Sequence, residues 1–235
     1  MKKIYLDNAA TTQVDEKVLR KMVPYLSEKF GNPSSLHLLG QEAKRGLMEA
    51  REIIARAIGA RHDEIVFTGS GTEANNFVLK GLFFKNKGKN HIITTKIEHD
   101  CVLNACKWLE KQGAEVTYLD VDSEGFVNVE DVRKAIKENT LVVSVIHGNN
   151  EIGTIQNLEE IGRVCRESGV YFHSDACQSF TKVDLNVKKQ NLDFVTLNAH
   201  KIHGPKGVGV LYIRKDLKKE IDVLLHGGGQ ESGLR

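Results

Sequence analysis

The sequence predicts an α/β fold with a mainly parallel, seven-stranded sheet between helices. Short β-rich apolar runs alternate with longer segments of helical periodicity, the pattern that parallel strands joined by right-handed crossovers produce. The run 141–146 is almost wholly apolar, which is typical of a strand covered on both faces. Strands are expected at 64–68, 90–95, 114–119, 141–146, 170–174, 194–197 and 207–213.

Helical patterns lie before and between these strands. Two amphipathic helices, around 15–29 and 40–58, should precede the sheet, with the turn-rich loop 30–35 between them. Further helices are expected at 77–84, 101–112 and 158–168. The sequence contains no repeat, low-complexity tract or linker-like segment, so a single large domain should form most of the chain.

The composition favours a soluble globular protein. Of 235 residues, 40% are hydrophobic and 27% are charged, with 33 basic and 31 acidic residues. This even balance gives no support to binding of nucleic acid or a membrane surface. With no signal peptide and no apolar run of about 18 residues, we expect a cytoplasmic location.

The four cysteines show neither a metal nor a redox spacing. No pair has the CxxC pattern, so we expect no metal site and free, mostly buried thiols. The cysteines are Cys101, Cys106, Cys165 and Cys177.

Five polar, glycine-bearing segments each follow a different predicted strand. In the segment 68–76, Gly71 allows close approach of the backbone to a ligand, and the helix that follows offers free N–H groups to a phosphate. The hydroxyl of Thr72 can add a donor. A capping turn without a ligand would explain this segment equally well.

The other four segments carry one or two reactive or hydrogen-bonding side chains each. His99 lies at a strand-to-helix junction, where it could equally be a capping histidine. Asn150 follows the most apolar strand in what could be a simple tight turn, and Asp175 could be a helix cap. Lys201 lies in a glycine- and histidine-rich turn, although an isolated lysine is usually a surface residue.

Taken together, the five segments are complementary. Ligands of parallel sheets bind at the carboxyl ends of the strands, so these side chains can converge on one edge. Phosphate donors, an imidazole, amides, a carboxylate and a lysine are the groups that pyridoxal phosphate requires. The distance along the chain from Asp175 to Lys201 suits one crossover between adjacent strand ends.

These segments resemble the cysteine desulfurases, the class V branch of the fold-type-I pyridoxal-phosphate enzymes. The resemblance runs through the chain in the order typical of that family. The matching stretches are 5–12, 31–35, 67–73, 98–99, 149–153, 175–178, 199–201, 204–207 and 227–231. It implies a fold-type-I large domain at 16–235 and an N-terminal segment, 1–15, that joins a small domain; the C-terminal small domain is absent from this sequence.

The resemblance also implies a role for each candidate residue. Lys201 would carry pyridoxal 5'-phosphate as a Schiff base and move protons, and His99 would stack on the ring and share in proton transfer. Asp175 would keep the ring nitrogen protonated. The remaining cofactor-binding residues would be Asn150 beside the ring, Gln178 at its phenolic oxygen, and Gly71, Thr72, Asn198 and His200 around the phosphate.

The implied reaction converts L-cysteine to L-alanine and passes the sulfur to an enzyme cysteine as a persulfide. Its destinations would be iron–sulfur cluster assembly or thiolation, with a homodimer and an iron–sulfur scaffold or other acceptor protein as partners. Asn198 replaces the family's usual serine, and Ser232 replaces an arginine. No cysteine matches a persulfide position, so we expect this chain to bind the cofactor without turning over cysteine alone.

Two alternatives remain open from the sequence. The first is a related class V aminotransferase, or a lyase acting on selenocysteine or kynurenine, because these share the Asp, His and Lys site. The stretches 149–153 and 227–231 favour the desulfurases. The second is a truncated cofactor-binding or scaffold subunit without catalytic activity.

Overall fold

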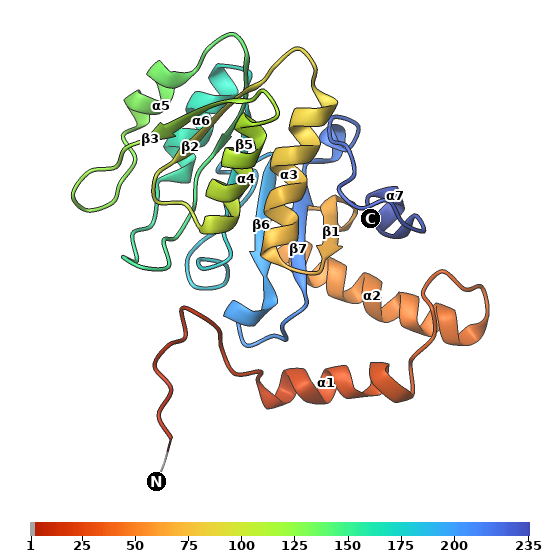
Figure 1. Cartoon of the computed structure of the whole chain (residues 1–235). Helices are drawn as coiled ribbons and strands as arrows, with labels where there is room; N and C mark the ends of the chain where they lie inside the picture. Colours follow the sequence, from red (N-terminus) through yellow and green to blue (C-terminus); the bar gives the residue numbers. More distant parts are fainter. Residues whose placement is uncertain (1–2) are drawn as a thin grey trace.

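A computed structural model, which describes residues 3–235, contains one seven-stranded sheet (Figure 1). The strand order is β1-β7-β6-β5-β4-β2-β3. The strands are β1 (Ile65–Thr68), β2 (His91–Thr95), β3 (Glu115–Leu119), β4 (Thr140–Ser144), β5 (Tyr171–Asp175), β6 (Phe194–Asn198) and β7 (Gly209–Ile213). All seven expected strands are therefore present, with ends that differ by a few residues.

The direction of β7 separates this sheet from a fully parallel one. Strands β3, β2, β4, β5 and β6 pair in parallel, whereas β7 is antiparallel to both β6 and β1. Two reversals leave β1 pointing the same way as β6. Six strands consequently direct their carboxyl ends to the same edge, as the prediction of a mainly parallel sheet requires.

Helices cover both faces of the sheet (Figure 1). On one face, α3 (Gly71–Lys85) and α4 (Asp100–Glu110) pack with alternate strand residues in one apolar cluster. On the other face, the second cluster joins the sheet to α2 (Leu38–Ala57), α5 (Val129–Ala135) and α6 (Leu158–Glu167). The sheet is thus the middle of three layers, and its carboxyl edge is left for a site.

Besides the direction of β7, two features were not expected from the sequence. Helix α5 is only seven residues long, too short for a helical period to stand out in its sequence. The connection from β5 to β6 forms turns where most parallel crossovers contain a helix. Helix α1 (Glu16–Ser27) was expected, but none of its residues is buried in this chain.

The N-terminal segment reaches the carboxyl edge of the sheet before α1 begins. Thr12 donates to the carbonyl oxygen of His200 through its backbone N–H at 2.9 Å and its hydroxyl at 3.0 Å. The backbone N–H of Asp15 donates to His203 O at 3.0 Å. These bonds attach the segment to the loop after β6. Within residues 3–235, no helix has the length and apolarity needed to cross a bilayer.

Candidate active site

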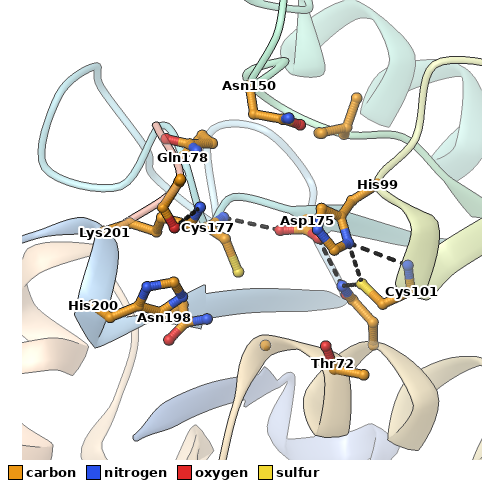
Figure 2. Close-up of a pocket in the computed structure, with 14 residues that line it drawn as sticks. Thr72, His99, Cys101, Asn150, Asp175, Cys177, Gln178, Asn198, His200 and Lys201 are labelled. Atoms are coloured by element: carbon orange, nitrogen blue, oxygen red, sulfur yellow. Dashed lines mark hydrogen bonds between the residues drawn. The ribbon is translucent and has the colours of Figure 1, made fainter. Parts of the chain in front are cut away.

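A pocket of about 270 Å³ opens at the carboxyl edge of the sheet (Figure 2). Fourteen residues line it, and they come from all five of the strand-end segments and from the N-terminal segment. All nine candidate residues from the sequence are among them. They are Gly71, Thr72, His99, Asn150, Asp175, Gln178, Asn198, His200 and Lys201.

Lys201 ends a short 3-10 turn directly after β6. Its Nζ donates to Ala10 O at 2.8 Å and also bonds Ala9 O, so the N-terminal segment lies against the amine. Burial lowers the pKa of Lys201, and the nearby Lys182 adds to this effect. A lower pKa raises the fraction of neutral amine, the form that reacts with a carbonyl group.

Asp175 ends β5, the strand next to β6, and is 4% exposed. Its Oδ1 accepts from the backbone N–H of Cys177 at 2.9 Å, and its Oδ2 accepts from Asn75 Nδ2 at 2.6 Å. The carboxylate therefore caps the turn that follows β5 and also faces the pocket. Both functions that the sequence left as alternatives for Asp175, a cap and a site residue, are compatible in this geometry.

His173 lies two residues before Asp175 on the same strand and is fully buried. Its ring nitrogens contact the hydroxyls of Ser144 at 2.8 Å and Thr196 at 3.2 Å. Burial lowers the pKa of His173 to about 4, although the charge on Asp175 opposes this shift. The His173 imidazole, two residues before Asp175 on β5, is therefore neutral at physiological pH.

His99 is the N-cap of α4 and lines the pocket at the same time. Its Nδ1 accepts from the backbone N–H of Cys101 at 3.1 Å and lies 3.0 Å from the Cys101 sulfur. A nitrogen that accepts an N–H bond carries no proton of its own in the neutral ring, which places the ring proton on Nε2.

The N-terminus of α3 forms part of the pocket wall. Ser70 caps this helix by accepting from the backbone N–H of Glu73 at 3.0 Å, so the helix starts at Gly71 inside the pocket. A Cβ at Gly71 would lie 2.7 Å from the Cys177 sulfur and 3.3 Å from Asn198 Nδ2. The glycine therefore keeps the space between the helix end and Asn198 open, where the helix dipole favours an anion.

His200 adds an imidazole near the same wall. Its Nδ1 lies 3.1 Å from the Thr11 hydroxyl. Burial lowers the pKa of His200, and the charges of Lys201 and Lys206 lower it further. A neutral His200 can still donate one hydrogen bond to a phosphate oxygen.

Gln178 and Asn150 lie at the rim of the pocket with exposed side-chain bonds (Figure 2). Gln178 Nε2 donates to Ala9 O at 2.6 Å, and its Oε1 accepts from Lys182 at 3.2 Å. Asn150 Nδ2 donates to Glu151 at 2.6 Å. Both amides are therefore engaged with protein groups and would exchange these bonds to contact a ligand.

Sequence reasoning missed five residues of the pocket. Asn75 lies one helical turn after Thr72, and Cys101 lies two residues after His99, so both were close to residues that had been identified. Their polar side chains at these spacings were the available signal. The missed residues are Ala10, Asn75, Cys101, Ile146 and Cys177.

The chemistry of the donor set fits pyridoxal phosphate. Lys201 offers an amine for the aldehyde, Asp175 a carboxylate for a ring nitrogen, and the N-terminus of α3 its free N–H groups for a phosphate. Gly71 leaves open the position that a Cβ would occupy.

Comparison with known proteins places this site in a family. The model of the aminotransferase class-V family matches residues 4–233. The cysteine desulfurase IscS of Clostridium botulinum (strain Kyoto / Type A2) is 51% identical over 235 residues, which are 100% of this chain and 59% of the relative. The chain thus spans about three-fifths of the length of that relative.

Solved structures share the fold. SspA in complex with cysteine matches with a TM-score of 0.96 and 46% identity, over 99% of this chain and 67% of the other. A NifS-like protein matches with a TM-score of 0.96 and 43% identity, over 100% and 64%. With the family model covering nearly all of its residues, the chain belongs to the class-V aminotransferase family.

Proposed function

We propose that this chain is the pyridoxal-phosphate-binding large domain of a cysteine desulfurase. The reaction is conversion of L-cysteine to L-alanine, with the sulfur passed on as a persulfide for iron–sulfur cluster assembly or thiolation. The observation that carries the proposal is the placement of Lys201, Asp175 and the N-terminus of α3 around one pocket. The 51% identity to a cysteine desulfurase supports the same activity.

The assignment of residues to the cofactor follows the donor set. Gly71, Thr72, Asn198 and His200 would hold the phosphate, and Lys201 would provide the amine for the aldehyde. Asp175 would accept a hydrogen bond from the ring nitrogen, Gln178 would bond the phenolic oxygen, and His99 would contact the ring. When bound, the cofactor supplies an electron sink for the negative charge that develops at the substrate Cα.

Proton movement is assigned to Lys201 and His99. The lowered pKa of Lys201 suits an amine that takes a proton from the substrate Cα and returns one. His99 presents an Nε2–H, because its Nδ1 accepts from the backbone N–H of Cys101. Asn150, at the rim, helps to place the substrate carboxylate. The related SspA was solved in complex with cysteine, which supports cysteine as the substrate here.

The four thiols of this chain are poorly suited to accept sulfur. Burial raises the pKa of Cys101 to about 11 and that of Cys106 to about 12. The pKa values of Cys165 and Cys177 are also raised, again by burial. Because the thiolate is the nucleophile, we assign the sulfur-accepting thiol to a cysteine other than these four.

The apolar surface of the N-terminal helices supports a homodimer. A groove of about 1030 Å³ lies along α1 and α2, and it includes Leu26, 76% exposed, and Phe30, 64% exposed. Large exposed apolar patches are typical of interaction sites between proteins. We also propose that residues 1–15 and 16–235 belong to different domains of the whole enzyme.

Two further assignments concern the cellular context. All four cysteines are free thiols, which suits a reducing compartment, so we place the protein in the cytoplasm. The partner that receives the sulfur is an iron–sulfur scaffold or another acceptor protein. The name IscS of the bacterial relative is consistent with that role.

The activity is tested on the polypeptide that carries this chain together with its acceptor cysteine. Incubation with pyridoxal phosphate, L-cysteine and a reductant should release alanine and sulfide in equal amounts. Transfer of the amino group to a keto acid without sulfide would identify an aminotransferase instead. Cofactor binding with neither product would identify a non-catalytic subunit.

A further inference from the structure

Asn75 connects two elements of the site from a fully buried position on α3. Its Nδ2 lies 2.6 Å from Asp175 Oδ2 and 3.1 Å from the Cys101 sulfur. An amide nitrogen has two hydrogens, so both are used by these two acceptors. If the Asn75 amide were rotated by half a turn, its Oδ1 would face the Asp175 carboxylate, and the two oxygens would repel each other.

The oxygen of the same amide is buried and has no hydrogen-bond partner among residues 3–235. An unpaired buried carbonyl oxygen carries a free-energy cost. The two hydrogen bonds that the amide nitrogen donates, to the carboxylate and to the thiol, offset this cost. The amide is therefore held by what its nitrogen contacts, and its orientation depends on Asp175 and Cys101.

Cys101 accepts from Asn75 and contacts His99, and Figure 2 shows the second of these contacts. Burial, followed by the charge on Asp175, raises the pKa of the Cys101 thiol to about 11, so the thiol keeps its proton at neutral pH. That proton has an acceptor in His99 Nδ1, 3.0 Å away. Nδ1 consequently receives two donors, the thiol and the backbone N–H of Cys101.

We propose that Asn75 and Cys101 are positioning residues, which form a hydrogen-bonded bridge that orients the Asp175 carboxylate and the His99 imidazole relative to each other. Neither residue needs to touch a substrate for this role. The bridge fixes one oxygen of Asp175, while the N–H of Cys177 fixes the other. The effect of this bridge on cofactor binding rests on the proposed function, but the bridge itself can be tested in the chain without cofactor.

The first test observes the His99 ring in the unliganded protein by ¹⁵N NMR at alkaline pH. The wild type should carry its proton on Nε2, with the Nδ1 resonance displaced by hydrogen bonding. Cys101→Ala should move that resonance toward the value of an unbonded nitrogen, and Cys101→Ser should restore it. A proton on Nδ1 in the wild type, or no change in Cys101→Ala, overturns the proposal.

The second test titrates pyridoxal phosphate into the protein and follows its absorbance. Asn75→Leu has a similar volume but no donor, and it should weaken cofactor binding about tenfold, as expected for loss of a hydrogen bond to a buried charge. The control is Asn76→Ala, which removes a partly exposed amide that donates to the carbonyl of Thr72 in its own helix at 2.9 Å. Unchanged binding by Asn75→Leu contradicts the proposal.

The two tests separate the failure of the bridge from the failure of the proposed function. A wild-type chain that does not bind the cofactor refutes the proposed function, while the NMR comparison still decides whether the bridge exists. If Asn75→Leu does not fold, as judged by circular dichroism, the Cys101→Ala and Cys101→Ser pair decides the matter, with cofactor titration as its second readout.

Discussion

Arg51 and Glu231 form a buried, bidentate ion pair that joins α2 to the turn α7 (Gln230–Gly233). The two guanidinium nitrogens of Arg51 lie 2.7 and 2.9 Å from the Glu231 oxygens. Arg51 also donates to Ile65 O at 2.6 Å, and Glu231 accepts from the N–H of Phe67 at 2.9 Å. Both side chains are about nine-tenths buried, so this pair connects α2, β1 and the last turn of the chain.

We predict that Arg51→Met lowers the free energy of unfolding by about 3 kcal/mol, because removal of one partner leaves an uncompensated buried charge on Glu231. Urea denaturation measures the effect. The control is Arg20→Met, which breaks an exposed pair with Glu16 whose side chains are 78% and 85% exposed, and should cost less than about 0.5 kcal/mol. Equal effects for the two variants would contradict the structure.

Lys201→Ala should abolish the visible absorbance band of the bound cofactor, because Lys201 is the one lysine among the described residues that line the pocket. Lys206→Ala changes an exposed lysine in the same loop and should retain the band. The two spectra are compared after gel filtration, which removes free cofactor. A normal band in Lys201→Ala would show that the attachment site has been assigned to the wrong residue.

Glu98 should make stability depend on pH. Its Oε1 accepts from Thr95 and from the N–H of Ile146, but burial raises its pKa from 4.5 to about 8. Between these values the unfolded state binds fewer protons than the folded state, so the free energy of unfolding falls as pH rises. The slope contributed by this one group approaches about 1 kcal/mol per pH unit.

Glu98→Gln resembles the protonated carboxyl and should remove that slope between pH 4.5 and 8. Urea unfolding at several pH values measures the difference from wild type. Glu124→Gln, at an exposed position, should keep the wild-type slope. If Glu98→Gln and the wild type lose stability in parallel across this window, Glu98 is ionised in the folded chain.

Residues 1–235 alone should bind pyridoxal phosphate and release almost no alanine from L-cysteine. The physical reason is the raised pKa of the thiols, including about 11 for Cys101, which leaves little thiolate at neutral pH. Alanine is measured by chromatography, and the positive control is the full-length cysteine desulfurase IscS of Clostridium botulinum (strain Kyoto / Type A2) in the same assay. Robust turnover by the short chain would show that one of its own thiols accepts sulfur.

The sequence predicted the seven strands from local patterns, and it predicted nine residues of the pocket from the polar turns after those strands together with the family resemblance. The apolar run at β4 and the polar turns after the strands are visible without a structure. The antiparallel direction of β7 was not predicted, although only ten residues separate it from β6. A connection that short cannot return the chain for a parallel pairing, so the loop length contained the information.

By itself, the sequence determined the types and order of the elements, and it identified Lys201 and Asp175 as a candidate pair. Those features follow from periodicity and turn chemistry within a few neighbouring residues. Only the tertiary structure decided that Asn75 bonds Asp175, that Cys101 faces His99, and that Arg51 pairs with Glu231. These partners lie on different elements, and their contacts depend on how the helices pack against the sheet, which no local pattern specifies.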